Sequence, residues 1–446
     1  MAMTDILILY ESRSREIENC ALLATELELR GYEVKIRNIC SPFKYFIKPR
    51  VLVVPHLYNE QQLIGFAKNF WLSNKNIVDL QYEQILGTSI KEDDIHNPQG
   101  QAKFAHHIAW GEDQASRYRS VGIPESNIHV TGSMSMDLMR KEFTNYFLTK
   151  QKIARQFNLD PNSEWILFVS SFSYANRTEE ELVRYEMLSP TARVFNKLSD
   201  ETLKEVAVWL EAAALKFPDK TFIYRPHPAE KTHQIFFEIT KRTPNFKVIG
   251  DYSMRQWAIV ADKAYNWYST SIADLFYAEK SCYIVRPIEI PHNLEVSILS
   301  DVKSLKTYED FENSISNNQF DFPITAERME YFYGKTDTEP AFRQIADICE
   351  KLLKGEYQGF NFDYGNYNRL NICNVDGFGN AIMYWLNIPF YSFCKAFRVK
   401  KVIWPFMHKQ KVVSLFDKNI YGIEDEIKRY QEKIGTVLKS SYCHCK

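Results

Sequence analysis

Two long stretches of this chain alternate short apolar segments with longer amphipathic ones. In the first stretch, Ile6–Tyr10 is strand-like, Ile17–Arg30 carries apolar residues at helical spacing, and Tyr32–Ile36 is strand-like again. Gly31 lies where a helix C-cap is expected. Repeated βα units form parallel sheets with helices on both faces. The alternation therefore predicts an α/β fold built on doubly wound parallel sheets.

The alternation starts again after a charged, helical stretch that ends at Asp160-Pro161-Asn162. Trp165–Val169, Thr221–Tyr224 and Ala264–Tyr268 are the clearest strands of this second series, and 446 residues exceed what one hydrophobic core usually supports. We therefore predict two Rossmann-like domains that face each other across a cleft. The predicted parts are a first domain over residues 1–145, a linker over 146–162, a second domain over 163–356 and a C-terminal helical and aromatic extension over 357–446.

Composition and charge exclude several classes of protein. The 55 basic and 56 acidic residues leave a net charge of −1, which argues against a general nucleic-acid binder. The 8 cysteines lack the regular spacing of a disulfide framework. A strand-like segment at Ile6 leaves no room for a signal peptide, and no apolar run is long enough to span a membrane. We expect a cytoplasmic protein with reduced thiols.

A rigid turn follows the strand-like segment Thr221–Tyr224. It consists of Arg225, Pro226, His227 and Pro228. Prolines restrict the backbone, and the carboxyl end of a parallel strand is where open α/β sheets bind ligands. We therefore predict that Arg225, His227 and Pro228 form a phosphate-binding turn, and His227 is also a candidate catalytic residue. Alternatively, His227 only caps the turn and Arg225 makes a surface ion pair.

Two further polar turns follow strands of the second domain. Ser269, Thr270 and Ser271 stand directly before a predicted helix, where free backbone amides attract anions. The loop after Trp165–Val169 is not glycine-rich, but it offers hydroxyl and amide groups to a ligand. We predict phosphate or nucleotide contacts at Ser170, Ser171, Asn176, Ser269, Thr270 and Ser271. Simple N-capping and an ordinary polar loop are the alternatives.

In the first domain, charged residues follow three of the predicted strands. Group transfer to a hydroxyl needs a base to take the proton, or a carboxylate nucleophile. Candidate catalytic residues are Glu11, Glu16 and Glu83, and candidate substrate-binding residues are Arg13, Arg15 and His56, of which His56 is also a possible base. Alternatively, the acids mark a helix start favoured by the macrodipole, and the arginines are their ion-pair partners.

We expect neither a metal ion nor another cofactor. A metal-dependent site for nucleotide-linked substrates usually shows a carboxylate cluster such as Asp-x-Asp. Neither Asp137 nor Glu112-Asp113 has that pattern. Positive side chains and helix N-termini can hold a phosphate without a metal.

The C-terminal extension contains a basic, aromatic stretch, Tyr391–Lys411. It has no acidic residue, and Phe393, Phe397, Trp404 and Phe406 are interleaved with lysines and an arginine. Such a stretch suits the surface of an anionic membrane. A helical pair that packs back on the core and exposes its basic face is an equally good interpretation.

Together these motifs resemble those of bacterial surface-carbohydrate (capsule and O-antigen) biosynthesis glycosyltransferases of the GT-B type. The layout is similar to capsule Kdo transferases, polysialyltransferases and CDP-glycerol glycerophosphotransferases. The resemblance covers roughly residues 5–290, and it rests on Glu11 with Arg15-Glu16, Ala109–Gln114, Ile128–Leu138, Phe168–Asn176, Arg225–Pro228 and Ser269–Ser271.

The resemblance implies a function for the whole chain. It implies that Arg225, His227 and Ser269–Ser271 contact the phosphate of a cytidine-nucleotide donor. The implied activity is metal-independent transfer of Kdo or another acidic sugar, from a donor such as CMP-Kdo, to a surface polysaccharide, lipopolysaccharide or lipid-linked glycan. The implied site of action is the cytoplasmic face of the inner membrane, with peripheral contact to anionic lipid. The acidic motif of polysialyltransferases is missing from the first domain, so the catalytic carboxylate stays open.

Three alternatives to sugar transfer remain. The first is a CDP-polyol phosphotransferase, and the second is an isomerase similar to UDP-sugar 2-epimerases, which share two Rossmann-like domains. The third is a non-catalytic scaffold that binds nucleotide sugars or glycans. Fold alone does not decide among them.

Overall fold

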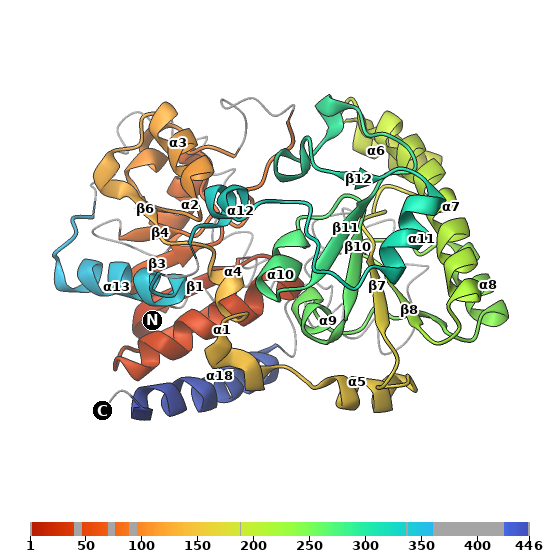
Figure 1. Ribbon diagram of the computed structural model, residues 1–446. Coiled ribbons are helices and arrows are strands. Elements are labelled where there is room, and N and C mark those ends of the chain that lie inside the picture. Colours follow the sequence, from red (N-terminus) through yellow and green to blue (C-terminus); the bar gives the residue numbers. More distant parts are fainter. Residues whose placement is uncertain are drawn as a thin grey trace, which may run out of the picture. The chain divides into compact units, whose positions relative to one another are not determined.

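The computed structural model describes residues 2–39, 47–69, 76–88, 96–187, 189–335, 338–359 and 423–444. The chain divides into two compact units (Figure 1). The first unit consists of Met1–Gln84, Glu92–Asp137 and Tyr333–Lys446, and the second of Ile85–Lys91 and Leu138–Phe332. Among the described residues, each unit contains one six-stranded sheet, and all the strand pairings are parallel. The predicted α/β class with two doubly wound domains is confirmed.

The first unit has the strand order β2-β1-β3-β4-β5-β6. From β1 the chain goes to β2 on one side and then to β3 on the other. Because βαβ crossovers are right-handed, this reversal puts successive helices on opposite faces of the sheet. Its elements are β1 (Ala2–Tyr10), α1 (Arg13–Leu29), β2 (Val34–Asn38), β3 (Ile47–Val54), α2 (Glu60–Asn69), β4 (Ile77–Asp79), β5 (His106–Ala109), α3 (Glu112–Ser120), β6 (Ile128–Val130), α4 (Met134–Asp137), α13 (Ala341–Lys354) and α18 (Glu424–His444).

The second unit has the strand order β12-β11-β10-β7-β8-β9. Helices α7, α8 and α11 lie on one side of this sheet, and α9 and α10 lie on the other (Figure 1). Its elements are α5 (Lys150–Phe157), β7 (Trp165–Val169), α6 (Glu179–Glu186), α7 (Ala192–Lys216), β8 (Thr221–Arg225), α8 (Gln234–Arg242), β9 (Phe246–Val248), α9 (Met254–Val260), β10 (Lys263–Asn266), α10 (Ile272–Tyr277), β11 (Ser281–Val285), β12 (Ser304–Leu305) and α11 (Tyr308–Ser316). Helix α12 (Ala326–Tyr333) ends where the chain returns to the first unit.

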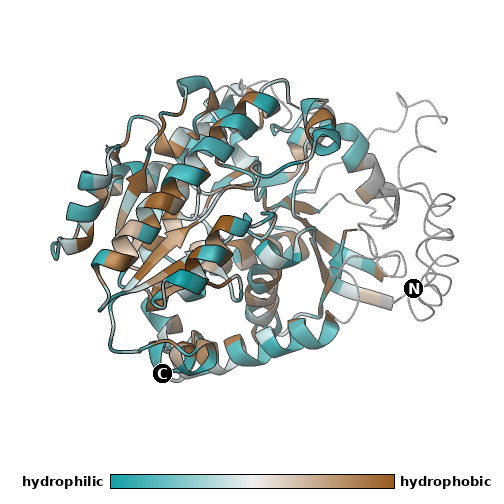
Figure 2. Cartoon of the chain, turned by 90° about the vertical axis from the view of Figure 1, so that its right-hand side faces the viewer, coloured by the Kyte–Doolittle hydropathy of each residue, from teal (hydrophilic) through white to brown (hydrophobic). Residues whose placement is uncertain are grey.

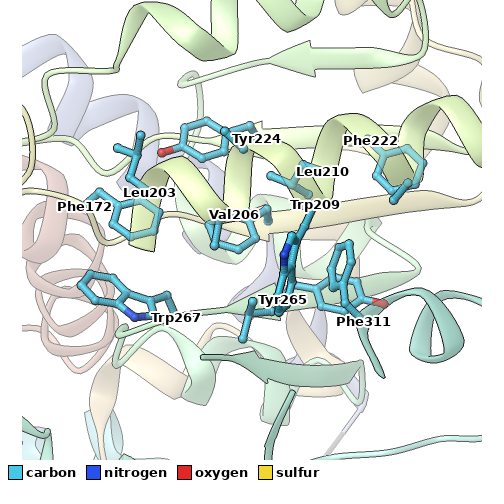
Figure 3. Close-up of a cluster of buried hydrophobic side chains, with 14 of the residues drawn as sticks. Phe172, Leu203, Val206, Trp209, Leu210, Phe222, Tyr224, Tyr265, Trp267 and Phe311 are labelled. Atoms are coloured by element: carbon cyan, nitrogen blue, oxygen red, sulfur yellow. The ribbon is translucent and has the colours of Figure 1, made fainter. Parts of the chain in front are cut away.

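Aromatic side chains fill much of the core of the second unit. Figure 3 shows Leu203, Val206, Trp209 and Leu210, which form one stripe of α7, among the buried rings of this cluster. The stripe follows the helical repeat, so the burial of one helix face explains it. The same segregation appears in Figure 2, where the strands are mostly apolar and the outer helix faces mostly polar. Much of the 14% aromatic content is therefore core.

The division of the chain differs from the one that we predicted. Helix α13, which we placed in the second domain, packs on α1, β3 and α4 of the first unit. Arg30 of α1 pairs with Asp347 and Glu350 of α13, and the Asp137 carboxylate accepts a hydrogen bond from Phe342 N at 2.8 Å. The predicted linker contains α5 and belongs to the second unit, where Lys150 Nζ is 2.6 Å from Asp262 Oδ2. Sequence periodicity locates these helices but not the sheet on which they pack.

The described end of the C-terminal extension packs on the first unit. Helix α18 runs beside α1 (Figure 1), with Ile427, Ile434 and Leu438 buried. Gly435 permits close approach, because a Cβ there would lie 3.6 Å from Thr25 Cγ2. This part of the extension therefore packs back on the core. The basic, aromatic stretch Tyr391–Lys411 lies outside the described residues.

Two glycines let separate segments of the first unit cross. Gly132 and Gly334 both have positive φ, at +86° and +82°. A Cβ at Gly334 would overlap the Trp110 carbonyl oxygen and lie 2.7 Å from Gly132 Cα. Next to this crossing, the rings of Trp110 and Tyr333 stack at 5.4 Å, and Ser133 N donates to Tyr333 O at 3.0 Å. The crossing joins the loops after β5 and β6 to the segment that precedes α13.

Two histidines pair across β5 and β6 of the first unit: buried His106 begins β5, and half-buried His129 is the middle residue of β6. His106 Nδ1 is 2.9 Å from His129 Nε2, and the Tyr357 ring stacks on His106 at 5.2 Å. Burial, with a smaller contribution from His107, lowers the pKa of His106 to about 4. Burial, reinforced by the neighbouring charges of His106, His107 and Lys351, lowers the pKa of His129 to about 3. Both rings are therefore neutral in the folded protein at pH 7.

We expect the His106–His129 pair to reduce the free energy of unfolding as the pH falls. In the unfolded chain a histidine has a pKa of about 6.5, so the unfolded state takes up more protons below that pH. The stabilisation is complete above pH 6.5 and is lost as the pH falls toward 4. Between pH 7.5 and pH 5.0, wild type should lose on the order of 1–2 kcal/mol more than His129→Gln in urea unfolding. The exposed His292→Gln serves as control, and equal losses in all three proteins would contradict the prediction.

Candidate functional sites at the sheet switch points

Each sheet has one point where the chain reverses its direction of winding. In the first unit this point lies between β1 and β3, and in the second between β7 and β10. The loops that leave neighbouring strands here go to opposite faces, so a crevice opens outside the carboxyl ends of the strands. Glu11 and His56 follow β1 and β3, and Ser171 and Tyr268 follow β7 and β10. These are the positions at which an open α/β sheet binds its ligand.

Arg225 ends β8 in the second unit, and its side chain is directed into the protein. The residue is only 7% exposed, and its Nη2 donates to Tyr252 O at 3.0 Å. Its Nε is buried without a hydrogen-bond partner among the described residues. Burial lowers the pKa of Arg225, while Asp274 acts in the opposite direction. The surface ion pair considered as an alternative is therefore excluded for Arg225.

His227 is exposed, and a hydrogen bond determines which of its ring nitrogens carries the proton. Its Nδ1 accepts a hydrogen bond from Ala229 N at 3.1 Å, so the neutral ring carries its proton on Nε2. The capping role that we considered as an alternative is thus present. The contact uses Nδ1, and Nε2–H lies on the other side of the ring.

The sequence interpretation missed Glu230, which holds this turn together. Its carboxylate accepts hydrogen bonds from Tyr224 Oη at 2.6 Å, from His227 N at 3.2 Å and from the Ser170 hydroxyl. Burial raises the pKa of Glu230, and these donors act against that shift. A carboxylate three residues after the histidine is a recognisable signal for such a turn. Glu230 therefore connects the loops that follow β7 and β8.

The loop after β7 is connected to the neighbouring loops. Ser170 N donates to Arg225 O at 3.0 Å, and the Ser171 hydroxyl accepts from Tyr268 N at 3.1 Å, across the switch point. Asn176 has a φ of +54°, and its side-chain amide donates to Lys231 O at 3.2 Å. These three residues therefore connect the loop after β7 to its neighbours. Whether they also contact a nucleotide stays a prediction.

The Ser269–Ser271 turn follows β10 at the same edge of the sheet. Asn266 holds it from both sides, accepting from Ser269 N at 2.9 Å and donating to Ser269 O at 2.7 Å. The Ser269 hydroxyl accepts from Ser271 N at 3.1 Å, so it stabilises the turn itself. Ser271 makes no capping hydrogen bond with its side chain, and Thr270 is exposed. The predicted phosphate contacts of Thr270 and Ser271 remain predictions.

In the first unit, Glu11 and His56 meet across the switch point. His56 Nδ1 is 3.7 Å from Glu11 Oε2, and the His56 ring stacks on Tyr58 at 4.9 Å. The Glu11 side chain is 55% exposed. This pair combines a reachable carboxylate with an imidazole beside it, which is the arrangement that a general base needs.

Glu16 has a different environment from Glu11. It is 1% exposed, and its Oε2 accepts from Glu11 N at 2.7 Å. Burial raises the pKa of Glu16 to about 7. A carboxylate enclosed in this way stabilises the β1–α1 turn but is hidden from a substrate. Glu16 in the first unit and Glu230 in the second thus both stabilise a loop by accepting a hydrogen bond from its backbone.

Arg15 and Glu83 form an ion pair beside this turn, and the Glu83 side chain is 43% exposed. Glu83 is positioned by Gln81, which the sequence interpretation missed: Glu83 N donates to Gln81 Oε1 at 3.3 Å. Gln81 is buried with a φ of +42°, and its own N donates to Asp79 Oδ1 at 3.1 Å. Strained backbone of this kind gathers at functional sites. Arg13, in contrast, pairs with Glu426 of α18.

The structure thus brings Glu11, Arg15, Glu16, His56 and Glu83 together in the first unit. In the second unit it brings together Ser170, Arg225 and His227. Among the described residues, no three His, Cys, Asp or Glu side chains gather so as to hold a metal ion. None of the described helices combines the length and low polarity that crossing a membrane requires.

Comparison with known proteins supports the fold. No protein-family model matches the chain, and no curated protein matches it in sequence. Among solved structures, the wall teichoic acid polymerase TagF, soaked with CDPG, matches with a TM-score of 0.51 and 11% identity over 79% of this chain and 89% of TagF. The UDP-GlcNAc 2-epimerase from Methanocaldococcus jannaschii matches with a TM-score of 0.50 and 14% identity over 78% of this chain and 99% of the epimerase. The chain has the two-domain, Rossmann-like GT-B fold.

Proposed function

We propose that this chain is a glycosyltransferase that uses a nucleotide sugar and requires no metal. The donor is a cytidine nucleotide of an acidic sugar such as CMP-Kdo, and the acceptor is a surface polysaccharide or a lipid-linked glycan. The observation that carries the proposal is the turn after β8, where buried Arg225 and exposed His227 follow a strand next to the switch point. The GT-B fold supports it, since the similar structures include a UDP-GlcNAc 2-epimerase and the polymerase TagF soaked with CDPG.

The proposed reaction forms a bond between an acceptor hydroxyl oxygen and the anomeric carbon of the sugar. The bond from that carbon to the phosphate oxygen breaks, and the nucleotide leaves with the electron pair. Arg225 and His227 stabilise the charge on the leaving phosphate. A carboxylate of the first unit takes the acceptor proton, and Glu11 is the best candidate because its side chain is 55% exposed and the His56 imidazole lies beside it.

Two other reactions fit the same turn. In a CDP-polyol phosphotransferase the phosphoanhydride bond breaks, CMP leaves and the product is a phosphodiester. An isomerase similar to UDP-sugar 2-epimerases would interconvert nucleotide sugars without any acceptor. Analysis of the products separates the three, because only sugar transfer leaves a new glycosidic bond.

A nucleotide screen tests the proposal. Wild type is heated with CMP, CDP, UDP, GDP or ADP, and the unfolding temperature is recorded. At about 100 times its dissociation constant, a ligand stabilises the folded state by about 2.7 kcal/mol, so the preferred nucleotide stands out. We expect a cytidine nucleotide, and we expect Arg225→Gln to abolish the shift while Arg242→Gln, at an exposed pair with Glu211, retains it. Absence of stabilisation by all five nucleotides would refute the proposal.

We also propose that the enzyme works on the cytoplasmic face of the inner membrane, where lipid-linked glycans are extended. The support comes from the basic and aromatic residues of Tyr391–Lys411, a composition that favours anionic lipid. Co-sedimentation with vesicles that contain anionic lipid, compared with neutral vesicles, tests this part separately from catalysis.

A further inference from the structure

We infer that His107 and Asp79 form a buried ion pair, and that this pair positions the loop that carries Glu83 in the first unit. His107 is the second residue of β5, and Asp79 is the last residue of the neighbouring strand β4. Both residues are fully buried. The ion pair is independent of the proposed function, whereas its role for Glu83 rests on that proposal. No sequence motif points to either residue.

The hydrogen bonds of His107 determine how many protons the pair holds. His107 Nε2 is 3.0 Å from Ala102 O, and a carbonyl oxygen only accepts, so Nε2 carries a proton. His107 Nδ1 is 2.9 Å from Asp79 Oδ2, so a further proton lies between these two atoms. Without it, the lone pair of Nδ1 would face the lone pairs of a carboxylate. The pair therefore holds one proton more than a neutral imidazole beside an ionised carboxylate.

The further proton belongs to the imidazole of His107. An imidazole is a stronger base than a carboxylate. Asp79 Oδ1 also accepts a hydrogen bond from Gln81 N at 3.1 Å, which favours the ionised carboxylate. A buried ion pair is tolerated when the remaining hydrogen-bond positions of both ions are filled, and here Ala102 O and Gln81 N each fill one. His107 is therefore an imidazolium, and Asp79 is its counter-ion.

The Asp79 carboxylate fixes the backbone of the loop after β4. It accepts from Gln81 N, and Gln81 has a φ of +42°. Such a backbone, in a residue other than glycine, persists only where its surroundings hold it. The Gln81 side-chain oxygen accepts in turn from Glu83 N at 3.3 Å and from Tyr58 Oη at 3.4 Å. Since the Glu83 side chain is 43% exposed, a chain of hydrogen bonds connects buried His107 to a reachable carboxylate of the candidate site.

Nuclear magnetic resonance of the imidazole nitrogens tests the ion pair without any substrate. In wild type labelled with ¹⁵N-histidine at pH 7.5, we expect both nitrogens of His107 to be protonated. The signals that are absent from the neutral double variant His107→Gln, Asp79→Asn identify this residue. In Asp79→Asn alone, the amide can donate to Nδ1 and still accept from Gln81 N, so Nδ1 should lose its proton while Nε2 keeps it. An unprotonated Nδ1 in wild type would overturn the ion pair.

Transfer kinetics test the positioning role. Asp79→Ala removes the acceptor of Gln81 N, and we expect kcat to fall by about 10–100-fold, as is typical when a reacting group is misplaced. Asp79→Asn keeps that acceptor and should stay within about threefold of wild type. When Glu83→Gln is already present, Asp79→Ala should lower kcat little further, because both changes then affect the same carboxylate. His129→Gln, a histidine of the same sheet, is the control.

The outcomes separate this inference from the proposed function. If wild type turns over no nucleotide sugar, the proposed function fails, and the resonance measurement still decides on the ion pair. If Asp79→Ala retains full kcat, or lowers it equally with and without Glu83→Gln, the positioning role is refuted. Circular dichroism confirms that each variant is folded. Should Asp79→Ala not fold, Gln81→Ala takes its place, since it removes the acceptor of Glu83 N and keeps the ion pair.

Discussion

Replacement of Gly334 by alanine is expected to prevent stable folding of the first unit. A Cβ at this position overlaps the Trp110 carbonyl oxygen and lies 2.7 Å from Gly132 Cα, so both clashes are with backbone. The φ of +82° adds strain for any side chain. Because the clashing atoms of both segments belong to the backbone, no flexible side chain can move to relieve the overlap. We expect a loss of more than about 4 kcal/mol, which is a large part of the stability of a typical domain.

The matched control is Gly355→Ala. Gly355 ends α13 with a similar φ of +75°, but a Cβ there meets nothing within 4 Å. This variant should lose only about 1 kcal/mol of stability, because alanine is strained in the left-handed backbone conformation. Urea unfolding, and the yield of folded protein, measure both changes. Equal effects of the two substitutions would show that backbone strain, not the crossing at Gly132, accounts for the loss.

Replacement of His227 should lower turnover by about 10²–10³-fold. Removal of one preorganised donor from a transition-state oxyanion typically has this effect. His227→Asn is the more informative variant, because its amide can still accept from Ala229 N, as Nδ1 does now at 3.1 Å, while the Nε2–H donor is lost. If His227 acts on the leaving phosphate, Asn and Ala should be similarly slow, and kcat should fall more than KM rises.

His292→Ala, at an exposed histidine of the same unit, is the control for the loss of an imidazole. If His227 only shapes the turn, His227→Asn should retain nearly full activity while His227→Ala loses it. Unchanged turnover of every nucleotide sugar in His227→Ala would remove the main support for the proposed site.

The sheets could be predicted from the sequence, because each strand is defined by local pattern. Trp165–Val169 agrees with β7, and Thr221–Tyr224 falls one residue short of β8, because Arg225 is charged yet buried. The return of α13 to the first unit could not be predicted. Its amphipathic pattern fits any sheet, and only contacts such as Arg30 with Asp347 determine which one it covers.

The positions of the candidate residues after parallel strands could be predicted from the sequence, but their environments could not. Loop residues after parallel strands gather by topology, which is why Glu11 and His56 meet. Glu16 and Glu11 are chemically the same in a sequence, and only burial and the hydrogen bond from Glu11 N distinguish the enclosed carboxylate from the reachable one. Glu230 escaped notice because its role depends on Ser170, which is distant along the chain, and on the backbone of the turn.

The interrupted path of the first unit has a consequence for biosynthesis. Along the chain, Leu138–Phe332 of the second unit lies between the second and third segments of the first unit. The third segment contains α13 and α18, which pack on α1. During translation from the N-terminus, the second unit can therefore be completed while α1 still lacks these two helices. Because domains generally fold as units in the order of synthesis, the sheet of the first unit should be the later one to mature, although its first strand emerges before any part of the second unit. A nascent chain that has emerged from the ribosome as far as Phe332 should accordingly have a folded second unit and an unfinished first one.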